Sequence, residues 1–369
     1  MSTLKTINII HPSGSTTNVV NDSSGNITVG GGITSGSALN MGSSFKRNRI
    51  LNGNMLVDQR NAGASTTPAA SGYLLDRFAW TGSIGSKLTF GQNLNSVTLP
   101  SGFTKYLGAQ TASATTPGAT EFYAEYQVIE GYNMADFGWG TANAKTVTLS
   151  FVAYSSLTGT FGGSIYNSAG NRCYPFSYSI PAANTWTTIS ITVAGDTTGT
   201  WATDNTAGAV IMFGLGAGAS VSGTAGAWGS TLYRSSTGAV QVVATNGATF
   251  YVTGVQLEVG TKATPYEMQI YSDQLAQCQR YYFDAASGSA TAVYQLAATS
   301  ISAVATTLPM VNWPPMRTTP TATVQNLTYS NGSALVFSPS SPSTARTYMT
   351  FSAAGTGFVL FNVLLSAEL

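Results

Sequence analysis

The stretch from Thr249 to Tyr282 constrains the fold most, because it joins a strand, a proline turn and the one convincing helix of the sequence. Residues 249–257 alternate with the period of 2 that is typical of a strand with both faces at least partly covered. Pro265 breaks the strand, and Ser272 is a suitable helix N-cap. Four side chains then predict one apolar stripe on a short helix: Tyr271, Leu275, Cys278 and Tyr282. Because a helix of about ten residues is marginal alone, we expect this stripe to dock on a neighbouring domain or another chain.

The rest of the sequence predicts strands on both sides of this junction. Strand patterns with turn signals between them occur at 50–57, 121–129, 146–154, 162–166, 186–193, 209–215, 239–244 and 249–257. No helix-length segment separates them, which favours an antiparallel β-sandwich or jelly roll over a parallel sheet. Beyond the helix, six further apolar runs between residues 292 and 365 repeat the pattern. We therefore predict an all-β fold with a second β-sandwich at the C-terminal end.

Composition excludes several classes of function. Only 8% of the 369 residues are charged and the formal net charge is +1, so no basic footprint for nucleic acid or an anionic membrane is present. No apolar run reaches the roughly 20 residues that span a bilayer. His11 is the sole histidine, which removes Ser/His/Asp and Cys/His triads. Cys173 and Cys278 form no metal-ligand pattern, so we expect two free thiols, no metal and no cofactor.

Four motifs carry a resemblance to a known family. VTGVQLEVG at 252–260, followed by ATPYE and LAQCQRYY, resembles the junction in many bacteriophage tail-fibre and prophage tail proteins. RNRILNGNMLVDQRNAG at 47–63, YLLDRFAW at 73–80 and LPMVNWPPMRTTPTATV at 308–324 support it in the same order. The strand succession also resembles carbohydrate-binding jelly rolls. Residues 253–255 lack the acidic residue that often marks a structural calcium in those modules, so the resemblance does not extend to a calcium site.

This resemblance implies a division of the chain into four parts. An N-terminal extended virion-attachment arm (1–45) precedes a carbohydrate-binding-like jelly roll (46–265), a linker helix (266–283) and a C-terminal β-domain (284–369). The arm has too few large apolar side chains for a core of its own, but short strand-like pieces alternate in it. Such arms resemble those that pair with neighbouring subunits or with a tail protein, whereas the plain alternative is a flexible tail.

Charged residues are scarce, so their clustering is informative. Asp58, Arg60, Asp76 and Arg77 hold an unusual share of them, and we expect carboxylate and guanidinium groups here to pair or to bond backbone at the rim of the sandwich. Glu121 and Glu125 share one strand face with Tyr123. Two carboxylates beside a ring suit a glycosidase pair or polar contacts to a sugar, but a solvated outer face is the plainer interpretation.

Aromatic residues in predicted loops are the better candidates for glycan contact, because sugar rings present apolar C–H faces that stack on such side chains. A glycine-flanked tryptophan equally suits a plug at the end of a sandwich. The candidates that we select from the loops and from the strand are Tyr132, Trp139, Trp201, Trp228, Tyr123 and Glu125.

Together these observations predict a structural virion protein of a tailed phage, assembled in the host cytoplasm and located in the tail. We expect a non-enzymatic tail fibre or appendage that binds host-surface polysaccharide for host attachment. As the resemblance implies, it would associate as a homotrimer and hold a virion protein through residues 1–45. The alternatives are a tailspike that depolymerises the same glycan, and an architectural collar, nozzle or capsid-decoration protein without a ligand.

Overall fold

The computed structural model describes residues 8–10, 17–21, 27–29, 46–286 and 292–369. The chain is all-β in these ranges apart from the helix α1 (Tyr271–Gln279) and short 3-10 turns. It divides into two compact units, 1–45 and 46–369. In the first unit, β1 (Asn8–Ile10), β2 (Thr17–Asn21) and β3 (Ile27–Val29) form an antiparallel sheet in the order β1-β2-β3. The predicted contacts of this arm with other subunits stay a prediction.

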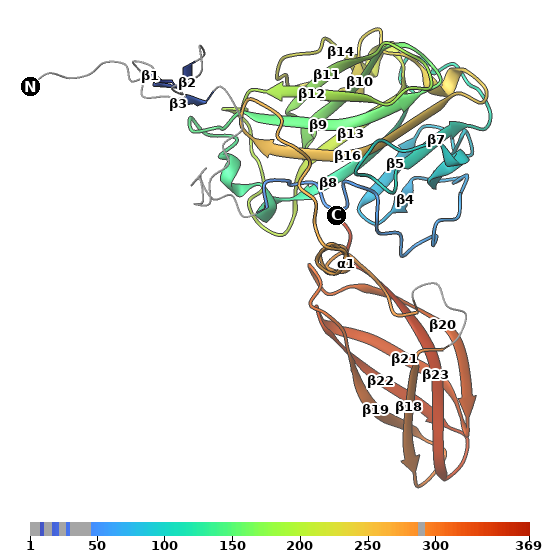
Figure 1. Cartoon of the computed structure of the whole chain (residues 1–369). Coiled ribbons are helices and arrows are strands. Elements are labelled where there is room, and N and C mark those ends of the chain that lie inside the picture. Colours follow the sequence, from blue (N-terminus) through green and yellow to red (C-terminus); the bar gives the residue numbers. More distant parts are fainter. Residues whose placement is uncertain (1–7, 11–16, 22–26, 30–45, 287–291) are drawn as a thin grey trace, which may run out of the picture. The chain divides into compact units, whose positions relative to one another are not determined.

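The second unit begins with a jelly-roll sandwich of two antiparallel sheets (Figure 1). The six-stranded sheet has the order β11-β10-β13-β8-β5-β4, from Cys173–Ile180, Gly159–Asn167, Ala207–Ala217, Phe122–Glu130, Phe78–Gly82 and Gly72–Leu75. The five-stranded sheet has the order β12-β9-β16-β7-β6, from Thr187–Val193, Val147–Ser155, Thr249–Val259, Leu107–Thr111 and Leu88–Gln92. A short parallel pair, β14 (Ser222–Gly223) and β15 (Ser235–Ser236), lies in the connection between β13 and β16.

The two sheets enclose one hydrophobic core, because inward positions on each strand are apolar. Phe161 and Phe213 of one sheet and Phe151 and Phe250 of the other belong to it, and none is more than 1% exposed. Ring contacts connect the layers, such as Phe151 to Phe213 with centroids 5.0 Å apart. Strand β16 lies in the middle of its sheet and all but its last residue are buried, as its period-2 pattern predicts.

Two of the predicted strands are wrong. Residues 50–57 form turns, in which Asn52 and Met55 have positive φ angles of 56° and 58°. The Asn52 side chain accepts from the Val57 N–H and donates to the Val57 carbonyl, so it takes the place of a strand partner. Residues 239–244 form no strand either, and Val242–Ala244 is a 3-10 turn. Strand β11 was not predicted, since Pro175 interrupts its pattern, but it is an edge strand, where proline is tolerated.

The C-terminal domain is a second, smaller sandwich, as predicted. One sheet joins β17 (Tyr282–Asp284), β18 (Tyr294–Ser300) and β20 (Thr321–Ser330) to β23 (Gly355–Ser366), and the other has the order β19-β22-β21, from Ala305–Asn312, Thr344–Phe351 and Gly332–Ser341. Strand β23 is central and its inward residues Val359, Phe361, Val363 and Leu365 are fully buried. Burial inside the domain therefore accounts for one face of this apolar run.

Helix α1 follows the predicted position but not the predicted stripe. Ile270 precedes it and makes no side-chain cap hydrogen bond, so the expected cap by Ser272 is wrong. Cys278 and Gln274 are the buried residues of the helix, whereas Tyr271 is 54% exposed. The Gln274 amide donates to the Asn54 side chain over 2.8 Å, which docks the helix on the turns before the jelly roll.

Candidate functional site

The structure separates the acidic pair Glu121 and Glu125: Glu121 is half-buried just before strand β8, and Glu125 does not lie on the solvated face that we expected. Glu125 faces the core opposite Phe213 and Trp80, and its carboxyl group is fully buried with no hydrogen-bond partner. Burial raises the pKa of Glu125 well above its ordinary value. Tyr123 is fully buried on the same face, so neither side chain reaches solvent and the pair cannot flank a sugar in this structure.

Three of the loop candidates meet at one end of the sandwich. Trp139, Trp201 and Trp228 contact one another edge to face, with ring centroids 4.7 to 5.4 Å apart. Trp139 and Trp201 are 5% and 7% exposed, and the N–H of Trp139 donates to the Lys145 carbonyl. These two rings therefore plug the sandwich, which is the alternative that the sequence left open beside glycan contact. Trp228 is only partly buried and donates its N–H to the Ala194 carbonyl.

Tyr132 lies apart from this cluster of three tryptophans. It belongs to the 3-10 turn Gly131–Asn133 after strand β8, and 62% of its surface is exposed. Its backbone N–H donates to the Asp204 carbonyl, which holds the turn against the preceding loop of β13. Of the six candidates, Tyr132 is thus the most accessible.

A cavity of about 180 Å³ opens where the two sheets end side by side. Strands β11 and β12 are the edge strands of their sheets, and they approach each other without pairing. Its lining is Tyr174, Phe176, Ser177, Ile191, Ala225 and Gly226. The Tyr174 ring contacts the ring of Trp228, with centroids 5.3 Å apart, so the tryptophan cluster supports one wall of this edge cavity.

The edge cavity is lined by one half-buried aliphatic side chain and one tyrosine hydroxyl. Ile191 is half-buried on the inward face of β12, whereas Phe176 is 1% exposed and belongs to the hydrophobic core. Among the contacts of the described residues, the Tyr174 hydroxyl has no hydrogen-bond partner in the chain, and Ser177 is exposed on the opposite face of β11. Burial raises the pKa of Tyr174, so its hydroxyl stays a donor at neutral pH. Arg172, the residue before strand β11, donates two hydrogen bonds of 2.7 Å to the two carboxylate oxygens of Asp196.

Sequence reasoning did not select this edge cavity. Its residues come from a strand that was not predicted and from the second edge strand. Among the residues selected from the sequence, Trp228 is the one that indicates its position, because its ring contacts the ring of the lining residue Tyr174. The pattern of the residues alone does not tell which strands lie at the edges of the sheets.

A second feature of the structure is a buried polar joint between the jelly roll and the C-terminal domain. Glu368 accepts hydrogen bonds from both Arg60 and Arg77, and the Arg77 side chain is 1% exposed. Arg77 also donates to the Val128 carbonyl and lies 3.6 Å from the centre of the Tyr281 ring. The Arg77 guanidinium thus has several partners, which offset part of its desolvation, while its Nε and that of Arg60 are buried without a hydrogen-bond partner.

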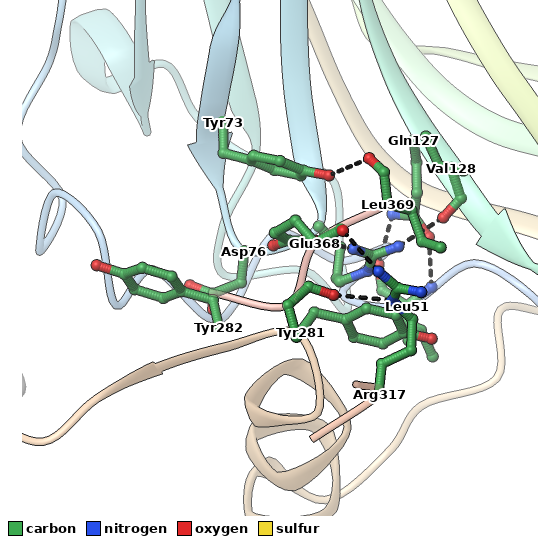
Figure 2. A network of polar contacts seen from close by, with 12 residues as sticks. Leu51, Tyr73, Asp76, Gln127, Val128, Tyr281, Tyr282, Arg317, Glu368 and Leu369 are labelled. Carbon is green, nitrogen blue, oxygen red and sulfur yellow. Dashed lines mark hydrogen bonds and ion pairs between the residues drawn. The ribbon is translucent and has the colours of Figure 1, made fainter. Parts of the chain in front are cut away.

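The joint extends on both sides of this ion pair. Tyr281 and Arg280 both donate to Glu130 at the end of strand β8. Arg317 donates to the carbonyls of Ala367, Glu368 and Asn205, as Figure 2 shows in part. The predicted structural pairing of the charged residues near 58–77 is thereby confirmed.

The motif at residues 47–63 packs against strand β16 of the jelly roll, next to this joint, for a physical reason. The Asn48 side chain bonds the Leu257 N–H and the Val255 carbonyl at a bulge of strand β16. A Cβ atom on Gly53 would lie 2.1 Å from the Val255 oxygen, so only glycine allows this approach. Gln127 forms two further bonds with the backbone of Leu51. All four motifs that carry the family resemblance contribute residues to this one joint.

The described residues contain no group of three or more metal-ligating side chains, and none of their helices has the length and apolar character to cross a membrane. Cys173 and Cys278 are both buried and free, as expected.

Comparison with known proteins assigns no family. No family model and no curated protein matches the chain. The solved structures similar to it include the enzymatically active domain of bacteriophage CBA120 tailspike protein 4, at 16% identity over 58% of this chain and 22% of that one, with a TM-score of 0.31. TmCBM61 in complex with β-1,4-galactotriose matches at 8% identity over 58% of this chain and 99% of that one, with a TM-score of 0.30. A family 11 carbohydrate-binding module from Clostridium thermocellum matches at 13% identity over 53% and 99%, with a TM-score of 0.28.

Proposed function

We propose that this chain is a binding protein of a tailed-phage appendage and that its jelly roll holds a host-surface glycan at the edge cavity. The observation that carries the binding proposal is the cavity between β11 and β12, with the Tyr174 ring and its free hydroxyl on one side and Ile191 on the other. Sugar recognition needs this combination, because a sugar presents C–H faces and hydroxyls at once. The place in a virion rests on the four sequence motifs and on the arm at residues 1–45.

The size of the edge cavity limits what it holds. About 180 Å³ is smaller than the roughly 300 to 1,000 Å³ of pockets for drug-sized ligands. One sugar unit of a longer chain therefore enters the cavity, and the neighbouring units lie outside. Binding by one unit is weak, so useful attachment follows from several copies engaging one polysaccharide.

The joint supports the same role mechanically. A binding domain in an appendage transmits load to the rest of the particle, and a buried network of arginines, Glu130 and Glu368 holds the two domains together by side-chain bonds. Breaking one partner of such a network is costly, because it leaves a buried charge unpaired. In this proposal the joint holds the two domains together and takes no part in a reaction.

The test is a screen of the purified full chain on an array of bacterial surface polysaccharides, with calorimetry on those that bind. Tyr174→Phe removes one hydroxyl and keeps the ring, so we expect a two- to ten-fold loss of affinity, or about 0.5 to 1.5 kcal/mol. Tyr271→Ala, at an exposed ring of helix α1, is the matched control and should bind as the wild type does. Release of new reducing ends would instead identify a depolymerase, and equal loss in both variants would exclude the edge cavity.

A further inference from the structure

The jelly roll has four edge strands in the part of the chain that the structure describes, and three of them are protected against pairing with another chain. Strand β4 has only four residues and an irregular register, and the Asn61 side chain donates to its Leu74 carbonyl. Strand β6 is covered by backbone bonds between Thr66 and Phe90. Strand β11 contains a proline, and the loop at 226–229 bonds its backbone. Natural sheets use such devices to prevent the addition of further strands.

Strand β12 is the fourth edge, and it carries none of these devices. It pairs with β9 in an unbroken register from Thr187 to Val193. Its other edge has no backbone partner among the described residues. The strand contains no proline, glycine or charged residue, and six of its seven residues are β-branched, as suits an extended chain. A bare and regular edge of this kind is a template on which another strand can pair.

The sequence of β12 indicates the partner, because it reads nearly the same in both directions about Ser190. An isoleucine stands on each side of Ser190, a threonine stands two positions away on each side, and both ends are β-branched. Ile189 and Ile191 contact the core of the sandwich, whereas Thr188, Ser190 and Thr192 are exposed on the other face. Two copies of β12 that pair antiparallel about Ser190 therefore place like residues opposite each other.

Both faces of the strand match themselves in this register. Ile189 lies opposite Ile191 of the second copy, so an apolar pair forms on the core side at each end. Thr188 lies opposite Thr192 of the second copy on the exposed side. The Thr192 hydroxyl donates to the Thr261 carbonyl over 3.1 Å, and it can still accept a hydrogen bond from that threonine. No charge lies opposite another, and a two-fold axis requires a self-complementary contact of this type.

We propose that β12 of one copy pairs with β12 of a second copy, which joins their two five-stranded sheets into one continuous sheet about a two-fold axis at Ser190. This interaction surface goes beyond the proposed function, because it rests on the strand edge and not on a ligand. Since Ile191 lines the edge cavity, the pairing places the edge cavities of both copies next to the same seam. Two linked sites hold one polysaccharide with greater avidity than a single site does.

A cysteine at the axis tests the pairing in the full chain. Directly opposite residues of an antiparallel pair have Cα atoms about 4.5 to 5.5 Å apart, which a disulfide can span. Under mild oxidation, Ser190→Cys should form a covalent dimer at least about ten-fold faster than Ser179→Cys, an exposed serine on edge strand β11. Non-reducing electrophoresis measures the dimer. The native Cys173 and Cys278 are both buried, so the introduced cysteine is the accessible one.

A mixture of two variants tests the register of the pairing. Thr188 should lie opposite Thr192 of the second copy, whereas the two copies of Thr188 would be about 14 Å apart along the seam. Thr188→Cys should therefore cross-link with Thr192→Cys when the two proteins are mixed, but Thr188→Cys alone should not.

Charge repulsion provides a measurement that needs no cysteine. Ser190→Lys places two like charges opposite each other at the axis, which destabilises an antiparallel pair. The mass of the full chain by light scattering should then fall to about half of the wild-type value. Ser179→Lys makes the same change on β11 and should leave the mass unchanged.

Four results would overturn the two-fold pairing. The first two are a Ser190→Cys cross-link that forms no faster than that of Ser179→Cys, and a Thr188→Cys protein that cross-links alone as readily as in the mixture. The third is a mass that Ser190→Lys does not change. The fourth is a lower mass for Ser190→Lys without the cross-link at residue 190, which would show that another segment, such as residues 1–45 of a neighbour, pairs with β12. All four are independent of whether polysaccharide binds, so the proposed function is tested separately.

Discussion

Replacement of Glu125 by glutamine should stabilise the jelly roll, and the gain should grow with pH. Glu125 lies in the sandwich core between strands that place Phe213 and Trp80 beside it, with no hydrogen-bond partner for either oxygen. Burial raises its pKa well above the ordinary value, so the folded protein keeps a proton that the unfolded chain releases. Stability is therefore lost as pH rises from the unfolded pKa of about 4.3 towards the higher folded pKa.

The magnitude follows from proton linkage. While the folded carboxyl keeps its proton, each pH unit above the unfolded pKa lowers the free energy of unfolding by about 1.4 kcal/mol. Glutamine has nearly the same shape and does not titrate, so the difference between Glu125→Gln and wild type should widen by up to about 1.4 kcal/mol per pH unit over the range in which the folded carboxyl stays protonated.

Urea unfolding followed by tryptophan fluorescence at pH 5, 6 and 7 measures the effect. Trp80, Trp139, Trp186, Trp201 and Trp228 all lie in the jelly roll, so the signal reports chiefly on this domain. Glu121→Gln, a half-buried glutamate next to the same strand, controls for removal of one carboxyl group. A difference between Glu125→Gln and wild type that is the same at all three pH values would refute the reasoning.

Three further predictions concern the joint, the surface and the arm. Glu368→Ala leaves the buried Arg77 without its partner and should lower the free energy of unfolding in urea by about 3 to 5 kcal/mol. Arg346→Ala, at an exposed arginine, should lower it by less than about 1 kcal/mol. Equal losses in the two variants would show that the joint contributes no more to stability than an exposed charge does. The C-terminal domain from residue 292 carries only Arg317, Arg346 and Glu368 as charges but exposes Leu327 and Val336, so the full chain should be oligomeric by light scattering. Leu327→Asp with Val336→Asp should lower its mass towards one chain while Met268→Asp does not, and an unchanged mass would place the interface elsewhere. Deletion of residues 1–45 should leave a folded protein that no longer enters particles, and unchanged incorporation would contradict an anchoring arm.

The fold class was predictable because alternation in a strand is local. Residues 249–257 and the apolar run at 357–365 carry the period and length of buried central strands, and the structure places β16 and β23 there. Residues 50–57 misled the prediction, because asparagine side chains satisfy the backbone of turns as well as a partner strand would. Where side chains satisfy the backbone in this way, the sequence shows no regular alternation that would distinguish the turns from a strand.

The site was harder to predict, because partners far apart in sequence leave no local signal. Both faces of strand β8 carry aromatic residues, so the pattern did not reveal that Glu125 points inward. Arg77 could be marked as a structural charge, but its partner Glu368 lies 291 residues away. The edge cavity likewise depends on which strands end the two sheets, which only the three-dimensional pairing decides.

The central claim is that the edge cavity between β11 and β12 holds a sugar. Methyl NMR of isoleucine-labelled full chain, titrated with short oligosaccharides of the polysaccharide that binds, tests this most directly, with the fully buried Ile129 on β8 as internal reference. We expect the Ile191 signal to shift in a saturable way with the oligosaccharide while Ile129 stays in place. Ile191 signals that stay unchanged with every sugar, or shifts that appear only at residues away from the cavity, would contradict the account.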